Sequence, residues 1–370
     1  MDFSLSADQQ AIAELASQIL TDKATNERQR AVEQADGPRF DRELWAEVAK
    51  AGLLGLAVPE AHGGAGLGFL EVAAILEHVG RHTAPIPILE TLVLGALPLA
   101  EFGSAAQQAA WLPRVAVGEA VLTAALEDDG PVRAEADGDG WRLHGTRLFV
   151  PAAAIADAVG IPVQTDAGPA FFLVGANADG LRAEDLQTTS AQPESKLGLD
   201  GVRVTAGDLL GSVGDGDRIA AWIRVRAKSA ACMVALGACR AALDLTSDYI
   251  KTRKQFDQPI AMFQAVGHRA ADAYVDTEAV SLTAWQAAWR LDAGLDAEKQ
   301  VAVAKLFAAE AGKRVVHAAQ HLHGGVGVDR EYPLHRYFLY ARHLELVLGS
   351  GTEHLLALGG LLAEDGVAGA

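Results

Sequence analysis

The chain has few cysteines and lacks the long hydrophobic runs of a membrane protein. Cys232 and Cys239 are the only cysteines among 370 residues. They share one face of a helical stretch and have no His or Cys companions at metal-ligand spacing, so we expect buried free thiols and neither a metal site nor a disulfide. Half of the residues are hydrophobic. No apolar run approaches the roughly 20 residues of a membrane span, however, and no transmembrane helix is expected.

The first residues also lack the features of a secretory signal. Met1-Asp2-Phe3-Ser4 contains no basic segment, which together with the scarcity of cysteine predicts a cytoplasmic protein. The formal net charge of −17 at pH 7 argues against nucleic acid and anionic membranes as partners. It does not exclude an anionic small ligand, because a few local basic residues can bind phosphate on an acidic protein.

Hydrophobic periodicity divides the chain into three parts. Residues 1–120 show helical spacing, and Ser6 and Gln9 form a capping-box pattern at their start. Residues 121–215 contain short apolar stretches separated by turn signals such as Asp137-Gly-Asp-Gly140. Residues 216–370 are helical again. We therefore predict a mainly α protein with a central β domain, divided at about residues 120 and 215.

One short loop between two helical runs combines residues suited to a phosphate-bearing ligand. Pro259 cannot lie inside a helix, so the runs on either side of Arg253-Lys-Gln-Phe-Asp-Gln-Pro-Ile260 must be separate helices. The guanidinium of Arg253 can bind two phosphate oxygens, and Phe256 can pack on an aromatic base. Taken alone, however, an Arg and a Phe in a helix–helix loop are commonplace, and ordinary packing explains them better.

A glycine-rich turn follows another helical run. The stretch Gln320-His-Leu-His-Gly-Gly-Val-Gly327 places glycines where a phosphate can closely approach main-chain N–H groups.

Together the two stretches resemble the acyl-CoA dehydrogenase family. In that family an Arg-x-x-Phe loop followed by Gln, and a Gln-x-x-Gly-Gly turn, hold the FAD of the neighbouring subunit. The glutamine of the turn falls on His321 here, with Gln320 one position away, and His321 can still donate a hydrogen bond. Pro59-Glu-Ala-His-Gly-Gly-Ala-Gly66 is similar to a segment of the family's amino-terminal domain. The resemblance implies FAD as cofactor and seven cofactor-binding residues: Arg253, Gln255, Phe256, Gln264, His321, Gly324 and Gly325.

The resemblance also implies a fold and a reaction. The fold comprises an amino-terminal helical domain, a middle β-barrel-like domain and a carboxy-terminal four-helix bundle. The reaction removes the α proton of an acyl-CoA thioester and passes a hydride from the β carbon to flavin N5. The α proton is weakly acidic, so a carboxylate base must lie within hydrogen-bond reach of it.

Neither of the family's two positions for this glutamate carries a carboxylate here. The position near the carboxy terminus falls on Leu348 or Ser350, and the position in the helix before the Arg253 loop falls on or beside Ala227. Two carboxylates lie near the first position. Glu353 is explained by a capping box with Ser350. Glu345 is either a displaced base or a solvated or salt-bridged helix residue.

The β domain also departs from the family pattern. The family's Thr-Glu-Pro-x-Ala-Gly-Ser-Asp loop, which surrounds the flavin ring, reads Leu126-Glu-Asp-Asp-Gly-Pro131 here. Its Trp-Ile-Thr strand reads Phe149-Val-Pro151, and Pro151 offers neither a hydroxyl nor an N–H to flavin. The half of the FAD site that a subunit gives to its own flavin is therefore eroded. The half that it gives to its neighbour's flavin is largely kept.

Because of this asymmetry, we predict that the chain is one subunit of a hetero-oligomeric acyl-CoA dehydrogenase. The chain resembles the glutamate-lacking subunit of α2β2 enzymes of actinobacterial steroid catabolism. It has no predicted catalytic residue, and a second acyl-CoA dehydrogenase-type subunit would carry the base. The resemblance further implies an acyl-CoA substrate, possibly steroid-derived, and electron-transferring flavoprotein as acceptor. Two alternatives stay open. One is a self-sufficient homo-oligomeric dehydrogenase that uses Glu345; the other is a non-catalytic flavin-binding or scaffolding protein.

Overall fold

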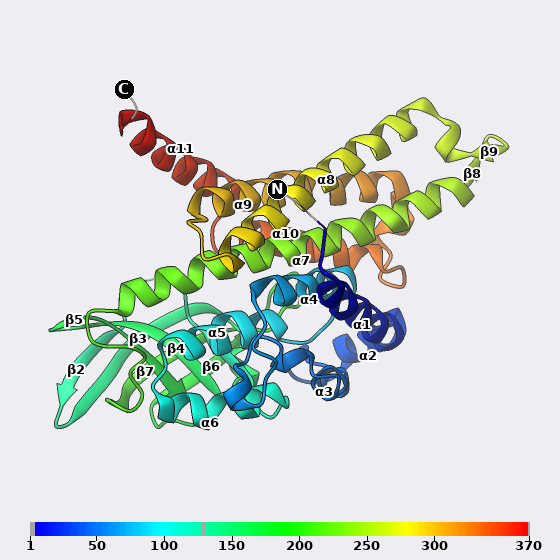
Figure 1. The fold of residues 1–370 in the computed structure, drawn as a ribbon. Coiled ribbons are helices and arrows are strands. Elements are labelled where there is room, and N and C mark those ends of the chain that lie inside the picture. Colours follow the sequence, from blue (N-terminus) through cyan, green and yellow to red (C-terminus); the bar gives the residue numbers. More distant parts are fainter. Residues whose placement is uncertain (1–3, 128–129, 369–370) are drawn as a thin grey trace. The chain divides into compact units, whose positions relative to one another are not determined.

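The computed structural model describes residues 4–127 and 130–368. Its residues form two compact units. The first contains Met1–Asn26, Ala73–Ala84 and Lys228–Ala370, and the second contains Glu27–Val72 and Pro85–Ala227. Figure 1 shows the course of the chain through both.

Helices and one curled sheet make up the second unit. Short helical elements precede the sheet: α2 (Asn26–Gln34), α3 (Arg42–Lys50), η1 (Leu53–Gly55), η2 (Glu60–His62), η3 (Leu89–Ala96), α5 (Leu97–Phe102) and α6 (Ala105–Ala116). Two longer helices, α4 (Phe69–Arg81) and α7 (Gly216–Thr252), have residues in both units. The element η3 is a π-helix, a form found frequently at functional sites.

The sheet has the strand order β1-β4-β2-β3-β7-β6, with β5 paired to β4. Its longest antiparallel pair is β3 with β7, and the register shifts twice along it. Gly138, at φ +65°, makes the predicted tight turn between β2 and β3. Every strand of this sheet lies within the stretch predicted for the β domain, although the exact domain limits stay predictions. The strands are β1 (Leu122–Ala124), β2 (Arg133–Asp137), β3 (Gly140–Pro151), β4 (Ala158–Thr165), β5 (Gly168–Gly175), β6 (Leu181–Leu186) and β7 (Glu194–Thr205), with the short helix η4 (Ala153–Ile155) after β3.

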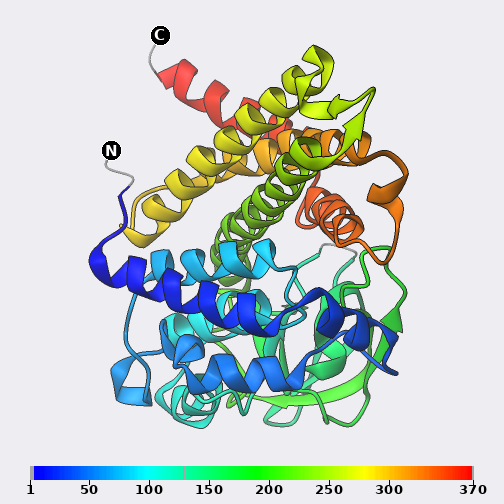
Figure 2. The ribbon, with the colours of Figure 1, turned by 90° about the vertical axis from the view of Figure 1, so that its right-hand side faces the viewer.

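The first unit is a helical bundle built around α9. Helix α9 packs against α8, α10 and α11, as Figure 2 shows for the yellow to red helices. Helix α1 begins with the predicted capping box, in which Ser6 and Gln9 exchange hydrogen bonds. The further elements are α1 (Ala7–Lys23), β8 (Lys254–Gln255), β9 (Gln258–Pro259), η5 (Ile260–Met262), α8 (Gln264–Asp292), α9 (Glu298–His323), η6 (Gly324–Val328), α10 (Leu334–Leu346) and α11 (Gly351–Ala368).

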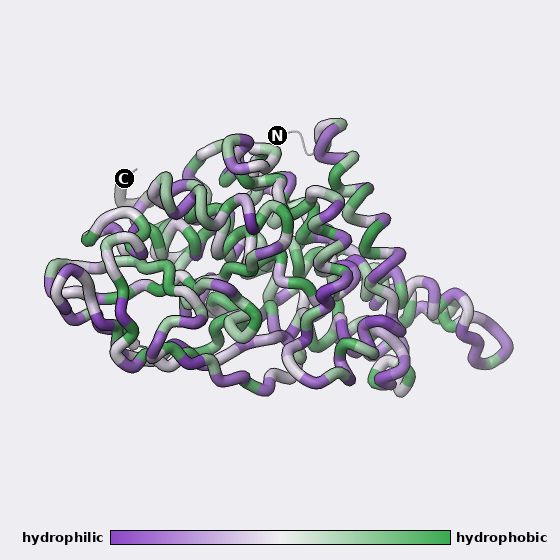
Figure 3. Tube along the Cα trace, turned by 90° about the horizontal axis from the view of Figure 1, so that it is seen from below, coloured by the Kyte–Doolittle hydropathy of each residue, from purple (hydrophilic) through white to green (hydrophobic). Residues whose placement is uncertain are grey.

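Small apolar side chains let these helices pack closely. Cys239 lies in a buried cluster with Ala273, Val315 and Ala318, and both cysteines are buried free thiols, as predicted. Burial raises the pKa of each thiol to about 12, so neither is a ready nucleophile. Hydrophobic and hydrophilic stretches alternate along the helices (Figure 3), as expected when each helix buries one face.

Among the described residues, two helical stretches are long and apolar enough to cross a membrane by length and composition, although the sequence led us to expect none. In Gly216–Thr252, 78% of the most apolar window is buried inside the protein, which accounts for its composition. In Leu334–Glu364 only 11% is buried. That stretch includes α11, which exposes Leu355, Leu356 and Leu362.

Candidate functional site

The predicted cofactor loop forms a small hairpin between two long helices. Figure 1 shows β8 and β9 at the far ends of α7 and α8. The loop closes where the Ile260 N–H donates to the Arg253 carbonyl over 2.8 Å, and β8 pairs antiparallel with β9. The connection predicted from Pro259 is therefore present, and Pro259 itself lies at the start of η5.

Phe256 occupies the turn of this hairpin in an unusual conformation. Phe256 and Asp257 have φ values of +52° and +63°, the left-handed region that a two-residue hairpin turn requires and that bulky residues avoid. The Phe256 side chain is 87% exposed, and its only ring contact among the described residues is an edge contact with Phe263 at 6.1 Å. The turn thus exposes an apolar ring to solvent or to a bound molecule.

The polar side chains of the loop are also exposed. Within residues 4–127 and 130–368, the guanidinium of Arg253 forms no ion pair and no hydrogen bond, and Gln264 is the exposed first residue of α8. Gln255 donates from Nε2 to the Lys254 carbonyl over 2.8 Å, which leaves its amide oxygen facing solvent. The loop therefore presents the uncommitted guanidinium of Arg253 and the exposed amides of Gln255 and Gln264, together with the ring of Phe256.

The glycine-rich turn lies at the end of α9. Gly324 has φ +60° and ψ −137°, a combination that is essentially restricted to glycine. A Cβ on Gly324 or Gly325 would meet no atom of this chain within 4 Å, so packing inside the chain does not explain the glycine at 325. Both positions are exposed and leave room for a ligand to approach the main chain.

Gln320 and His321 have different roles at this turn. In the amide orientation that satisfies both partners, Gln320 donates to the Gly327 carbonyl over 3.0 Å and accepts from the Val328 N–H over 3.2 Å. Gln320 therefore stabilises the turn from inside. His321 is exposed and has no side-chain partner among the residues described, so it remains available to a ligand.

A stack of one half-buried and one buried aromatic ring connects the two motifs. Tyr249, one helical turn before Arg253, stacks on His323 with ring centroids 4.4 Å apart, and His323 directly precedes Gly324. His323 Nδ1 lies 2.8 Å from the Ala319 carbonyl. Because a carbonyl can only accept, Nδ1 carries the proton and Nε2 accepts from the Tyr332 hydroxyl over 3.1 Å. Burial lowers the pKa of His323, which keeps it a neutral structural residue.

Sequence reasoning did not single out His323 or Tyr249. The sequence does place both near the motifs, because Tyr249 lies one helical turn before Arg253 and His323 directly precedes Gly324. The contact between them depends on how α7 packs against α9, which no local pattern reveals.

The family's carboxy-terminal base position is a tightly held loop without a carboxylate. Leu348 has φ +58°, and its carbonyl accepts from His354 Nε2 over 3.0 Å. The fully buried Lys305 donates from Nζ to the carbonyls of Leu344 over 2.7 Å and Gly349 over 3.1 Å. Burial lowers the pKa of His354 to about 4, so at neutral pH a neutral imidazole and one ammonium fix the loop.

The two nearby carboxylates are both engaged in structural contacts. Glu345 is buried and ion-paired with Arg342 and with Lys313, the latter over 3.5 Å. Glu353 accepts from the Ser350 N–H over 2.6 Å, which confirms the predicted capping box and lowers the pKa of Glu353. These ion pairs are those expected if Glu345 is a salt-bridged helix residue. The alternative base position, Ala227, is fully buried in α7.

The segments that fall on the family's own-flavin positions include an exposed left-handed residue and several contacts to main-chain carbonyls. Phe149 has φ +52° and is 53% exposed. The carbonyl of Pro151 accepts from Thr123 Oγ1 over 2.7 Å. Arg147 and Arg224 donate to the main-chain carbonyls of Gly130 and Leu126 over 2.6 Å and 2.9 Å. Asp128 and Asp129 of this loop lie outside the described residues.

A buried glutamate beside Pro151, Glu194, and the half-buried Glu90 that influences it were not predicted. Glu194 pairs with Pro151 across β3 and β7 and is 6% exposed. Burial, reinforced by the charges of Glu127 and Glu90, raises the pKa of Glu194 to about 7. Burial also raises the pKa of Glu90, in the π-helix η3, to about 7. These carboxyls come from distant parts of the sequence, so only the fold could reveal the cluster.

Comparison with known proteins shows that two parts of the chain match two domains of one family. Residues 6–119 match the acyl-CoA dehydrogenase N-terminal domain and residues 215–358 match the C-terminal domain of the same family. Acyl-CoA dehydrogenase FadE27 of Mycobacterium tuberculosis is 41% identical over 375 residues, covering 98% of this chain and 99% of the relative. FadE28 of the same organism is 36% identical, covering 97% and 98%.

Solved structures give the same result. The ChsE4–ChsE5 complex from Mycobacterium tuberculosis matches with a TM-score of 0.94 and 42% identity, covering 98% of this chain and 99% of the matched chain. A variant of the Tcur3481–Tcur3483 steroid ACAD matches with a TM-score of 0.90 and 43% identity, covering 97% and 99%. A structure of PigA with FAD and proline matches with a TM-score of 0.90 and 26% identity, covering 98% and 99%.

These matches confirm several of the sequence-based predictions. The predicted mainly α fold with a central β domain is correct, as is the resemblance on which it depended. FAD is confirmed as the cofactor. The individual cofactor-binding residues stay predictions, and all seven are exposed in the structure.

Proposed function

The chain belongs to the acyl-CoA dehydrogenase family, and on that premise we propose that it is the subunit of a hetero-oligomeric enzyme that lacks the catalytic base. In this proposal it binds the adenosine and pyrophosphate of a flavin whose ring lies in the partner subunit. FAD, when bound, accepts the hydride from the β carbon of an acyl-CoA. The residues of this chain hold and orient the cofactor, and the partner provides the glutamate.

One observation carries the proposal: the motif residues face outward and are uncommitted. Arg253 has no acidic partner among the described residues, and Phe256 is 87% exposed on a left-handed turn. A charged fork and an aromatic ring suit a pyrophosphate and an adenine. The open approach to the main chain at Gly324 and Gly325 leaves room for a phosphate. A ligand bound here from outside would cover the ring and pair the cation.

The base positions support the same division of labour. Leu348 and Ala227 cannot accept a proton, and Glu345 is engaged by two cations. The proton from the substrate α carbon must therefore go to a group in another chain. This disfavours the alternative of a self-sufficient homo-oligomer, which needs Glu345 free to act.

We extend the proposal to the substrate and surroundings of the enzyme. The likeness to a steroid ACAD and to a two-component complex favours a steroid-derived CoA thioester and an α2β2 assembly. The acceptor is electron-transferring flavoprotein, and the location is the cytoplasm. Neither nucleic acid nor a membrane is a partner in this proposal, in keeping with the net charge of −17.

The test is the flavin content of the complex after Arg253→Ala. Loss of one charge-assisted contact of about 1.5 to 3 kcal/mol predicts a roughly tenfold to hundredfold weaker affinity for FAD. FAD released per pair of chains is measured below saturating FAD, beside the mass of the complex. Arg182→Ala, at another exposed arginine without an ion pair among the described residues, is the matched control. Undiminished flavin in an intact Arg253→Ala complex would refute binding by this loop.

The remaining alternative, a non-catalytic flavin-binding or scaffolding protein, predicts a different result. Under it the purified chain, alone or with any partner, binds flavin without turnover. The proposed function predicts a colourless chain that gains both flavin and activity only with its partner. A visible spectrum and a single-turnover assay of each preparation decide between them.

A further inference from the structure

The aromatic stack between α7 and α9 lies within one helical turn of both cofactor motifs. The carbonyl of Tyr249 accepts the N–H of Arg253 over 2.8 Å, in the hydrogen bond that closes the last turn of α7. His323 is the last residue of α9, and the next residue is Gly324. The two rings have centroids 4.4 Å apart and planes 24° apart. A shift of either ring therefore moves the main chain of a motif.

The packing of α7 against α9 leads up to this stack. Ala242 of α7 and Ala319 of α9 lie in one buried cluster. Tyr249 follows Ala242 by seven residues, which places both on one face of α7. His323 follows Ala319 by four residues, which places both on one face of α9. The stack thus extends the contact of these two helices toward the motifs.

The imidazole of His323 is held in one orientation. Its side chain is buried, Nδ1 donates to the Ala319 carbonyl over 2.8 Å, and Nε2 accepts from the Tyr332 hydroxyl over 3.1 Å. The ring of Tyr332 also contacts the imidazole, with centroids 5.2 Å apart. An apolar side chain would fill this buried space without needing two hydrogen-bond partners. The imidazole has both nitrogens satisfied instead, so rotation of the ring would break two hydrogen bonds.

Tyr249 contributes its aromatic face to the stack. Within residues 4–127 and 130–368 its hydroxyl forms no hydrogen bond, and its side chain is half-buried. The face-to-face contact with His323 is therefore the specific interaction that this ring makes. Stacked aromatic pairs stabilise a structure beyond the area that they bury, and they favour particular ring orientations.

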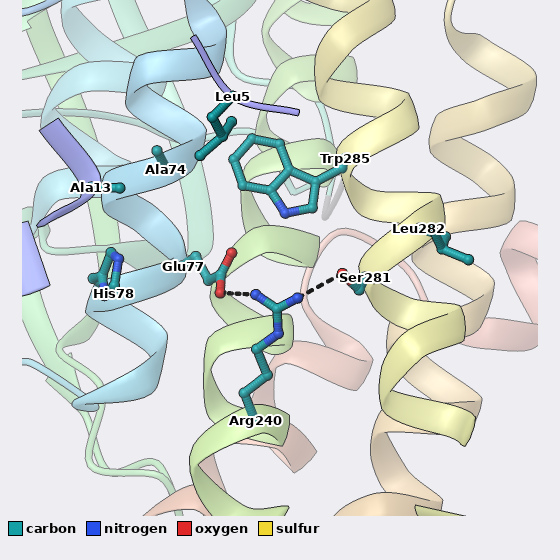
Figure 4. Close-up of a pocket in the computed structure, with 9 residues that line it drawn as sticks. All are labelled: Leu5, Ala13, Ala74, Glu77, His78, Arg240, Ser281, Leu282 and Trp285. Atoms are coloured by element: carbon teal, nitrogen blue, oxygen red, sulfur yellow. Dashed lines mark hydrogen bonds and ion pairs between the residues drawn. The ribbon is translucent and has the colours of Figure 1, made fainter. Parts of the chain in front are cut away.

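Helix α7 is fixed a second time, nearer its middle. Arg240 donates to Ser281 Oγ on α8 over 2.9 Å and is ion-paired with Glu77 on α4, as Figure 4 shows. Arg240 precedes Tyr249 by nine residues, which is about two and a half helical turns. Helix α7 is thus attached to α8 at one level and to α9 at the next. The hairpin that joins α7 to α8 and the turn that ends α9 therefore belong to one framework.

We propose that Tyr249 and His323 are positioning residues for the cofactor site. Their stack sets the distance between the guanidinium of Arg253 and the main chain at Gly324, so that both reach the same pyrophosphate. Neither ring contacts the cofactor, and each acts through the motif residue that follows it. This inference rests on the proposed function, because it requires a flavin bound by this loop and this turn. It adds two residues that are not among the seven predicted cofactor-binding residues.

The first test is a double-mutant cycle on the affinity of the flavin-free complex for FAD. Tyr249→Leu removes the stack, and we expect the dissociation constant of FAD to rise about threefold to tenfold while the mass of the complex is unchanged. In a complex that already carries Arg253→Ala, the same substitution should change the constant by less than about twofold, because Tyr249 acts through Arg253. An equal rise in both backgrounds, or no rise in either, would overturn the proposal.

Two matched variants separate positioning from general stabilisation. Tyr249→Phe keeps the ring and removes a hydroxyl that forms no hydrogen bond among the described residues, so it should keep the wild-type affinity for FAD. Tyr340→Leu is the control, because Tyr340 is likewise stacked on a histidine, His343, but in α10 and outside both motifs. A weakened affinity in Tyr249→Phe, or an equal loss in Tyr340→Leu, would contradict the positioning role. Circular dichroism confirms that each variant is folded.

A second cycle tests the two rings against each other. His323→Leu removes the same stack from the other side, so the double variant with Tyr249→Leu should lose less affinity than the product of the single losses. A loss equal to the product would show that the rings act independently. Failure of the proposed function looks different, because FAD affinity would then be unchanged in Arg253→Ala. A weakened Arg253→Ala complex beside an unaffected Tyr249→Leu complex would refute the positioning role alone.

Discussion

Glu345→Gln distinguishes a structural carboxylate from a displaced base. The substitution keeps the shape of the side chain and removes its charge. Glu345 is 9% exposed at its side chain, whereas its partners Arg342 and Lys313 are 35% and 40% exposed. A partly solvated network of this kind lies between an exposed pair, about 0 to 1 kcal/mol, and a fully buried one, about 3 to 5 kcal/mol. We expect a loss of about 1 to 2 kcal/mol in the free energy of unfolding.

Activity should change little in the same variant. Loss of a general base removes roughly 10² to 10⁴ in rate, whereas loss of an ion pair that only stabilises the fold should leave the rate within about tenfold. The assay is acyl-CoA oxidation per bound flavin in the assembled complex, with an artificial electron acceptor. Glu353→Gln serves as a control because that carboxylate is committed to a helix cap.

The refuting outcome is specific. A rate loss of roughly 10² or more, with flavin content and mass unchanged, would place the base in this chain. It would also require Glu345 to leave its two cations when substrate binds. The self-sufficient homo-oligomer would then replace the proposed division of labour.

Two further predictions follow from other residues. Because the folded-state pKa of Glu194 is raised to about 7 from its usual 4.5, its contribution to stability is present below pH 4.5 and is lost as the pH rises through about 7. Glu194→Gln should therefore raise the melting temperature more at pH 8 than at pH 5, and an equal effect at both would contradict the burial argument. Phe256→Gly relieves a left-handed φ of +52° and removes a ring with few contacts in this chain. The isolated chain should therefore keep its stability within about 1 kcal/mol while the complex loses flavin; a strongly destabilised isolated chain would show that the ring packs internally instead.

Much of the fold could be predicted from local patterns. Ser6 and Gln9 predict their capping box because both partners lie within one helical turn. Pro259 predicts the break between α7 and α8 because proline cannot continue a helix. Gly138 predicts the hairpin between β2 and β3. Each of these features depends on residues that lie close together in the sequence, so a local pattern is enough to predict it.

The candidate site could be predicted only in part. The Arg253 loop and the Gly324 turn are recognisable as motifs, but their meeting through Tyr249 and His323 depends on the packing of α7 against α9. The role of Glu345 was open because its partner Lys313 lies on another helix. The carboxyl cluster at Glu194 was invisible for the same reason.

The cofactor loop contains two features that interactions within the described residues do not explain. Phe256 lies on a left-handed turn and is 87% exposed, although burial of an aromatic ring is normally favourable. Arg253 has no ion pair among the described residues, although a guanidinium binds a phosphate or carboxylate through two hydrogen bonds. Under the proposed function a flavin held by a partner subunit would cover the ring and pair the cation.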